Sequence, residues 1–128
     1  SGQCRHNGLG RHGIQHLGAA QIAFLLMGLA SGQVAFDPKT GALVLSDITS
    51  ETKQVMENIK SILEAAELTF AHVIKTTIFL SDMGLFAQVN EVYGSYFSKD
   101  FPARETVAIK TLPRNVNIEI SITAVLTL

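Results

Sequence analysis

The sequence predicts an α+β fold: one domain in which two helices pack on one face of a mixed β-sheet. Two segments, at about 50–67 and 83–98, repeat their apolar residues every three or four positions, as amphipathic helices do. Segments rich in β-branched residues precede, separate and follow them, in the order β-β-α-β-α-β-β. The 128 residues suffice for one hydrophobic core and are too few for two ordinary domains. No repeat or linker divides the chain, so we treat residues 1–128 as a single domain.

The first thirty residues combine an irregular segment with an apolar one. Residues 1–17 are rich in glycine, histidine and arginine and follow no period, which indicates a loop or a poorly ordered end. Residues 18–30, GAAQIAFLLMGLA, form the most apolar run, but they are too few to span a membrane as a helix. We expect a buried strand at about 24–31. A secretory leader is the alternative, because arginines precede the run and small residues follow it.

A turn and a long helix follow. The segment DPKTG at 37–41 combines proline and glycine as turns do, so residues 33–36 and 42–45 are predicted to form the arms of a hairpin. In the first helix, Thr49 or Ser50 can cap the first turn. The apolar positions, which predict its buried face, are Val55, Ile59, Ile62, Leu63 and Ala66. The charged positions, which fall mostly on the other face, are Glu51, Lys53, Glu57, Lys60 and Glu64.

The carboxyl-terminal half supplies the remaining elements. HVIKTTIFL, at 72–80, is β-branched and apolar, which predicts a central strand. Asp82 can cap the second helix, whose apolar positions are Phe86, Val89, Tyr93 and Phe97. Two further strands, at 106–110 and 116–126, are separated by a turn at Pro113.

The composition limits the kinds of partner that the protein is expected to bind. The formal net charge is −1 and the basic residues are scattered, so nucleic acid is not expected as a partner. With 47% hydrophobic and only 16% charged residues, the chain is expected to cover apolar surface in an oligomer. Cys4 is the one cysteine, which excludes an internal disulfide and fits a reducing compartment. The cytoplasm is the expected location, with the mitochondrion as the alternative.

Two motifs in the amino-terminal segment suggest ligands but lack the context that such ligands need. GLGRHG, at 8–13, has the glycine spacing of a dinucleotide-binding loop, yet no buried strand leads into it. His6, His12 and His16 would hold zinc only on a regular scaffold, which the intervening glycines oppose. No serine stands in a nucleophile-elbow motif. The sequence therefore predicts neither a cofactor nor a metal.

Two ionised residues stand in the strand-forming region near the carboxyl end. Arg104 follows Pro-Ala directly, and Glu119 lies between Ile118 and Ile120. Because side chains alternate along a strand, Glu119 projects away from both isoleucines, which fits a solvated strand face with Arg104 on a surface loop. The same residues fit a site in which the guanidinium binds a small carboxylate and the glutamate handles a proton or a water. Spacing alone leaves both interpretations open.

Several segments closely resemble those of a known family. They are SGQVAFDPKTG (31–41), TKQVMENIKSILEAA (52–66), VIKTTIFLSDM (73–83), VNEVYGSYF (89–97), FPARETVAIKTLP (101–113) and IEISITAV (118–125). In order and spacing they resemble the RidA family, also called YjgF, over about residues 31–126. The resemblance implies a chorismate-mutase-like fold that assembles as a homotrimer with ligand sites between subunits. It also implies hydrolysis of 2-iminobutanoate and 2-iminopropanoate to 2-oxo acids and ammonia, with no cofactor.

The resemblance implies roles for residues of this chain. Arg104 matches the arginine that binds the substrate carboxylate, and Glu119 matches the glutamate that helps to position or activate water. The other residues expected at the cleft are Ser31, Gly32, Asn90 and Thr106. Arg104 and Glu119 are expected to face one cleft across a subunit interface, around a small 2-imino or 2-oxo acid.

The chain departs from the family pattern in three places. Residues 12–24 stand in place of a segment whose tyrosine borders the ligand, and they contain no tyrosine. Thr106 stands where cysteine is frequent, and Ser121 stands where a second glutamate is usual. A protein that binds 2-oxo acids without turning them over is therefore an alternative to the enzyme. An RNA-cleaving translation inhibitor is a third hypothesis, which the near-neutral charge disfavours.

Overall fold

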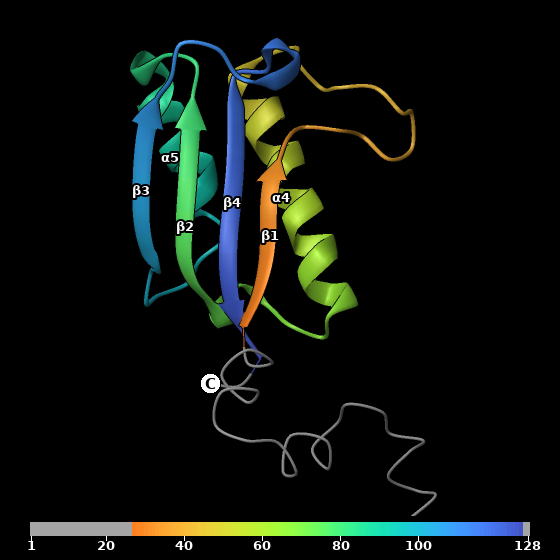
Figure 1. Ribbon diagram of the computed structural model, residues 1–128, viewed down its shortest axis with the longest axis vertical. Helices are drawn as coiled ribbons and strands as arrows, with labels where there is room; N and C mark the ends of the chain where they lie inside the picture. The colour runs from red at the N-terminus through yellow and green to blue at the C-terminus, as the bar shows by residue number, and fades with distance from the viewer. Residues whose placement is uncertain (1–26, 127–128) are drawn as a thin grey trace, which may run out of the picture.

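A four-stranded mixed sheet forms the centre of the molecule (Figure 1). The structure is a computed structural model and describes residues 27–126. The strands are β1 (Met27–Gln33), β2 (Val73–Leu80), β3 (Ala103–Ala108) and β4 (Ile118–Val125), in the spatial order β1-β4-β2-β3. β4 is antiparallel to both of its neighbours, whereas β2 and β3 are parallel. The hypotheses about residues 1–17, Cys4 and the three amino-terminal histidines fall outside the described residues.

Two helices cover one face of this sheet. α4 (Ile48–Ala65) and α5 (Phe86–Gly94) both lie behind the strands in Figure 1, and no helix of the described chain lies on the other face. α5 belongs to the connection between β2 and β3, which are parallel and cannot be joined by a tight hairpin. The predicted α+β fold is therefore confirmed. Within residues 27–126, neither helix combines the length and the apolar character needed to cross a bilayer.

The hydrophobic core lies between the helices and the sheet. In β4, Ile118 and Ile120 are fully buried, and burial alternates along the whole strand. α4 buries Val55, Ile59 and Leu63, which recur every four residues along one side of the helix. This packing determines which residues of each strand face the helices and which face the open side of the sheet.

The helix α4 begins at Ile48, two residues before the predicted start. Asp47 caps it, rather than Thr49 or Ser50, because the Asp47 Oδ1 accepts the N–H of Ser50 at 2.7 Å. The hydrogen bonds from Ser50 hold the pKa of the Asp47 carboxyl below its ordinary value. On the predicted buried face, Val55, Ile59 and Leu63 are buried, whereas Ile62 and Ala66 are exposed.

The second helix and the strand after it also have different bounds. Asp82 acts as a cap, as predicted, but it caps a 3₁₀ turn, Met83–Leu85, that leads into α5. α5 ends at Gly94 rather than at 98. β3 starts at Ala103 rather than at 106, because it pairs in parallel with β2 over its whole length. Arg104 is therefore a strand residue.

The predicted hairpin at 33–45 forms its turn but not its arms. Gly41 has φ +76, and its N–H donates to the carbonyl of Asp37 at 2.8 Å, which closes the turn. Beyond the turn, pairing is limited to one isolated bridge between Phe36 and Leu43. Arms this short provide too few ladder hydrogen bonds to form a separate pair of strands.

Glu51 is buried completely, although the helix pattern placed it with the exposed charged residues. Its Oε2 accepts the backbone N–H groups of Asn117 at 2.8 Å and Ile118 at 3.3 Å, and its Oε1 accepts the Asn117 side-chain amide at 2.8 Å. The pairing of β1 with β4 extends only to Gln33 opposite Ile120, so the start of β4 has no strand on that side. The Glu51 carboxylate supplies the acceptors that a strand would otherwise provide.

Candidate functional site

Arg104 reaches from β3 toward α5. Its Nη1 donates a hydrogen bond to the Oδ1 of Asn90. Its Cζ lies 5.4 Å from the centroid of the Phe86 ring and 5.2 Å from the centroid of the Tyr93 ring. At an exposed residue such as Arg104, cation–π contacts contribute roughly 0.5–1 kcal/mol each. One helix therefore fixes the guanidinium through one hydrogen bond and two aromatic faces.

Tyr93 is the rigid part of this arrangement. Its ring is buried, and its hydroxyl donates to the Oγ1 of Thr76 at 3.0 Å. Thr76 lies opposite Arg104 in the register of β2 and β3. Burial raises the pKa of Tyr93, against the opposing effects of the Thr76 hydroxyl and the Arg104 charge, so the phenol is neutral at physiological pH. The aromatic face under the guanidinium cannot rotate away without breaking a buried hydrogen bond.

A cavity of about 450 Å³ opens beside the guanidinium. It is lined by Asn90, Tyr93, Gly94, Phe101, Pro102 and Arg104. No carboxylate of the described chain pairs with Arg104; the ion pair found in that region joins Lys75 to Glu105 at 3.5 Å. A guanidinium carries several N–H donors in a planar fork, and the bond to Asn90 uses one of them. The cavity thus presents a free cationic fork to a small anion.

Thr106 lies two residues beyond Arg104 on the same side of β3. Its Oγ1 is buried and has no hydrogen-bond partner among residues 27–126. Buried hydroxyls are nearly always hydrogen-bonded. This atom is therefore a point at which a ligand or a second chain would supply a partner.

A second group of predicted residues gathers at the junction of β1 and β4. The register between these strands shifts between Ala30 and Gln33, so that Ser31 and Gly32 together face Ser121. Two residues opposite one make a β-bulge, a feature that bends a strand and redirects its side chains. The Ser-Gly segment of the sequence therefore forms a local irregularity in an otherwise regular antiparallel pair.

The bulge lies against Glu119. Gly32 has φ +60, and its N–H donates to the Oγ of Ser121 at 2.8 Å. A methyl group added to Gly32 would lie 3.7 Å from the Oε2 of Glu119. Glu119 is half-buried and lies opposite Phe79 of β2. The bulge and the Glu119 carboxylate therefore share one small region of the sheet surface.

Arg104 and Glu119 lie on opposite faces of the sheet. Arg104 contacts α5, whereas Glu119 alternates with the buried Ile118 and Ile120 and faces the side without helices. β2 separates their strands, which therefore run about 10 Å apart in the sheet. The predicted site residues form two groups: Arg104, Asn90 and Thr106; and Ser31, Gly32 and Glu119. A single chain does not bring both groups into one cleft.

Known proteins resemble the chain over most of the described region. The sequence profile of the family described as Endoribonuclease L-PSP matches residues 25–126. The chain belongs to this family. Within it, protein DfrA of Myxococcus xanthus is 47% identical over 107 residues, which cover 84% of this chain and 82% of that protein. The 2-iminobutanoate/2-iminopropanoate deaminase of Salmonella typhimurium is 44% identical over 102 residues, covering 77% of this chain and 79% of that protein.

Solved structures of the L-PSP family share the fold. The structure of E. coli TdcF with bound serine matches with a TM-score of 0.74 at 36% identity, and the match covers 78% of this chain and 80% of that chain. Together with the profile match, these relatives confirm the RidA resemblance predicted from the sequence.

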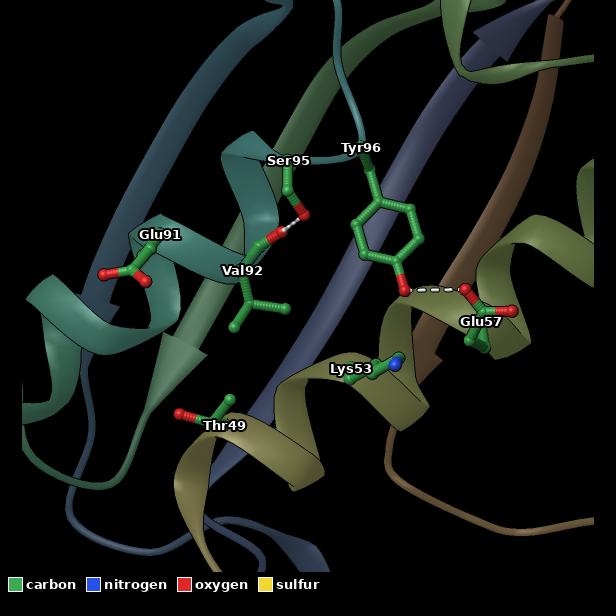
Figure 2. A pocket seen from close by; sticks show the side chains of 7 residues that line it. All are labelled: Thr49, Lys53, Glu57, Glu91, Val92, Ser95 and Tyr96. Atoms are coloured by element: carbon green, nitrogen blue, oxygen red, sulfur yellow. Dashed lines mark hydrogen bonds between the residues drawn. The ribbon is translucent and has the colours of Figure 1, made fainter.

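This L-PSP-family chain has another hollow, of about 400 Å³, between α4 and α5 (Figure 2). Figure 2 shows its lining residues, which are Thr49, Lys53, Glu57, Glu91, Val92, Ser95 and Tyr96. The Tyr96 hydroxyl donates to the Oε2 of Glu57 at 2.6 Å, and the Ser95 hydroxyl donates to the carbonyl of Val92, also at 2.6 Å. Two hydroxyl groups of this hollow are therefore already hydrogen-bonded within the chain, while Lys53 and Glu91 bring charges of both signs to it.

No metal centre is indicated in the described part of this L-PSP-family chain. Among residues 27–126, histidine, cysteine, aspartate and glutamate side chains do not gather in any group of three or more that could hold an ion.

Sequence reasoning missed the partners of Arg104 within the L-PSP-family fold. Helical spacing identifies Phe86 and Tyr93 as core residues but does not show that their rings face the guanidinium. The spacing of these residues could have indicated the contact. Phe86, Asn90 and Tyr93 are four and three positions apart, so they share one side of a helix. Ser121 was identified as a departure from the family, but its contact with Gly32 depends on a bulge that the sequence does not reveal.

Proposed function

We propose that the protein is an imine deaminase that hydrolyses small 2-imino acids, such as 2-iminobutanoate and 2-iminopropanoate, to 2-oxo acids and ammonia. The main support for this proposal is the guanidinium of Arg104. Residues of α5 hold it in place, and no carboxylate of the described chain pairs with it. A planar guanidinium held in this way suits the planar carboxylate of a small acid. The name of the Salmonella relative supports the same reaction.

Substrate binding is assigned to the cavity beside Arg104. The free N–H groups of the guanidinium bind the two carboxylate oxygens of the imino acid. Phe101 and Pro102 line the same cavity and suit a short aliphatic side chain. Asn90 keeps the guanidinium from rotating, so the imine carbon is held in one place relative to the carboxylate.

The chemical step is assigned to a water molecule and Glu119. The water oxygen bonds to C2 of the protonated imine as the C=N electron pair moves to nitrogen, and the Glu119 carboxylate takes the proton that the water loses. The protonated Glu119 then returns this proton to the amine nitrogen. Ammonia leaves as the C2 hydroxyl becomes a carbonyl and releases its proton to solvent. Backbone groups near Thr106 orient the attacking water.

We place the reaction between the subunits of a homotrimer. Arg104 and Glu119 face opposite sides of one sheet, so a cleft that contains both must combine two chains. The side without helices exposes the apolar side chains of Leu29, at 71%, and Val107, at 42%, which a neighbouring subunit would cover. Packing the β1–β4 bulge of one subunit against the Arg104 edge of the next unites the two groups, and three-fold symmetry produces three such sites.

A coupled assay tests the proposed reaction. A threonine dehydratase generates 2-iminobutanoate, semicarbazide traps it, and semicarbazone formation is followed with and without the protein. We expect the wild-type protein to slow semicarbazone formation by consuming the imine. Arg104→Ala should lose at least about 30-fold in kcat/KM, because it removes the charged partner of the carboxylate.

A matched control separates the role of Arg104 from a general effect of charge. Arg114 lies in the 3₁₀ turn Pro113–Asn115 before β4, at the end of the sheet opposite to the start of β3 (Figure 1). Arg114→Gln should retain wild-type activity. Full activity in Arg104→Ala would contradict the proposed function.

A protein that binds small carboxylates without turnover is the second candidate. The relative described as TdcF with bound serine favours it, because the same Arg104 fork would serve for binding alone. Saturable binding of 2-oxobutanoate, measured by calorimetry, together with an unchanged rate of imine loss would identify this function. RNA degradation by the purified protein would instead favour the RNA-cleaving alternative, which the net charge of −1 disfavours.

A further inference from the structure

The hydroxyl of Ser121 closes the bulge that lies against Glu119. The N–H of Gly32 donates to the Ser121 Oγ at 2.8 Å, across 89 positions of the chain. Ser31 and Gly32 are both exposed, and the bulge interrupts the ladder hydrogen bonds that would otherwise hold them. The Ser121 side chain therefore replaces a missing backbone acceptor at this point.

From this contact we propose that Ser121 is a positioning residue for the deaminase site, acting through Gly32 on Glu119. The proposal rests on the proposed function for its kinetic consequence, but its structural consequence can be measured without it. Ser121 and Glu119 are next-but-one neighbours on the same face of β4, and the buried Ile120 and Ile122 fix their strand against the core.

The Glu119 carboxylate lies against Gly32, because a methyl group added to the glycine would lie 3.7 Å from its Oε2. The glycine in turn is held by the Ser121 hydroxyl, which accepts its N–H. A general base must stand at a fixed position to take a proton from water. Without the Ser121 hydroxyl, the Gly32 N–H would lose its acceptor and the backbone beside Glu119 would shift. Ser121 therefore keeps the Glu119 carboxylate in the position from which it reaches the water.

The first test observes the Gly32 amide directly. The pair serine–glycine occurs twice in the sequence, at 1–2 and 31–32. When the protein is labelled with ¹³C-carbonyl serine and ¹⁵N-glycine, a carbonyl-filtered spectrum therefore contains only the amides of the two glycines that follow a serine. In Ser121→Ala we expect the Gly32 amide proton to move upfield and to exchange with solvent about tenfold faster, because its acceptor is lost. Ser121→Thr retains a hydroxyl and should leave both properties close to the wild type.

Thr123→Ala is the matched control. It removes a hydroxyl from the next outward-facing position of β4 and should not change the Gly32 amide. An unchanged Gly32 amide in Ser121→Ala would overturn the proposal, and so would an equal change in Thr123→Ala.

The second test is kinetic. In the semicarbazide assay, Ser121→Ala should lower kcat about tenfold and change KM less than about twofold, because the substrate carboxylate is bound by Arg104. Ser121→Thr should restore kcat. A wild-type kcat in Ser121→Ala, or a loss confined to KM, overturns the proposal. If the wild-type protein does not hydrolyse imines, the proposed function fails, and the Gly32 amide alone then decides whether Ser121 holds the bulge.

Discussion

The Oε2 of Glu51 accepts the backbone N–H of Asn117 at 2.8 Å, although the two residues are 66 positions apart in the chain. This bond ties the first turn of α4 to the residue just before β4. Glu51→Ala would leave the buried N–H groups of Asn117 and Ile118 without acceptors, so we expect the free energy of unfolding to fall by about 3 kcal/mol. Urea denaturation at constant protein concentration measures this loss.

Glu51→Gln should cost less than Glu51→Ala. The amide oxygen can still accept from the backbone N–H groups, and the Asn117 side chain can rotate so that its oxygen accepts from the new amide and its NH₂ donates to Ser81. We expect a loss of about 1 kcal/mol or less. Glu64→Ala, at an exposed position of the same helix, should change the stability by less than about 0.5 kcal/mol. Equal losses for Glu51→Ala and Glu64→Ala would refute the role of the buried carboxylate.

Asn90 offers a sharper test of ligand binding than removal of Arg104. Asn90→Asp places a carboxylate where the amide oxygen now accepts from the guanidinium, so it competes with the ligand for the same charge. We expect the dissociation constant of 2-oxobutanoate, measured by calorimetry, to rise about 30-fold. Asn90→Ala should raise it less than about threefold. If Asn90→Asp bound the ligand as well as Asn90→Ala, the ligand carboxylate would not be at Arg104.

The raised pKa of Tyr96 predicts that the stability of the protein depends on pH in the alkaline range. Burial, together with the hydrogen bond and the charge of Glu57, raises the pKa of Tyr96 above its ordinary value of 10.0. A raised pKa means that the folded state favours the protonated phenol. The stabilisation is therefore complete below about pH 10 and is lost as the pH rises from there toward the higher pKa of the folded state.

The variant Tyr96→Phe isolates this effect. It loses the hydrogen bond to Glu57, so near pH 8 we expect it to be about 1 kcal/mol less stable than the wild type. Above about pH 10 the difference should shrink, because only the wild type loses the contribution of Tyr96. Urea denaturation of both proteins at a series of pH values checks this. A difference that stays constant into the alkaline range would show that the phenol is not held protonated by the fold.

Gly32 and Gly41 form a matched pair. Both have positive φ, +60 and +76, so replacement by alanine should destabilise each by about 1 kcal/mol. A methyl group on Gly41 would meet no atom within 4 Å, whereas one on Gly32 would lie 3.7 Å from the Glu119 carboxylate. The methyl group on Gly32 would make an ordinary contact with this carboxylate and would cover part of it from water, so Gly32→Ala should lower kcat in the imine assay, while Gly41→Ala should not. Equal activities of Gly32→Ala and Gly41→Ala would show that the bulge does not contribute to the reaction.

Much of the fold could be predicted because local pattern and tertiary packing agree. The four-residue spacing of Val55, Ile59 and Leu63 indicates the helix and also the face that it buries. Glu51 could not be predicted in the same way. Its burial depends on β1 ending before it reaches the start of β4, and the need for an acceptor at that point is a property of the assembled sheet.

The candidate site could be predicted in its residues but not in its geometry. The family motifs identify Arg104 and Glu119 by residue type and spacing. Their placement on opposite faces follows from β3 beginning at Ala103, which makes Arg104 a strand residue directed toward α5. The sequence pattern predicted a later start for that strand, so the face occupied by Arg104 was not defined. The Gly32–Ser121 contact was equally inaccessible, because it requires a shift in register.

The central claim is that Arg104 of one subunit and Glu119 of another complete one site. The most direct test uses two single variants, Arg104→Ala and Glu119→Gln, each of which we expect to be inactive alone. Equal amounts of the two proteins are mixed, unfolded and refolded together. In randomly mixed trimers about a quarter of the sites would join an intact Arg104 to an intact Glu119, so we predict recovery of about a quarter of the wild-type imine hydrolysis. Native mass spectrometry establishes that the subunits have mixed. A mixed preparation as inactive as its two parents would contradict the claim that the site is shared between chains.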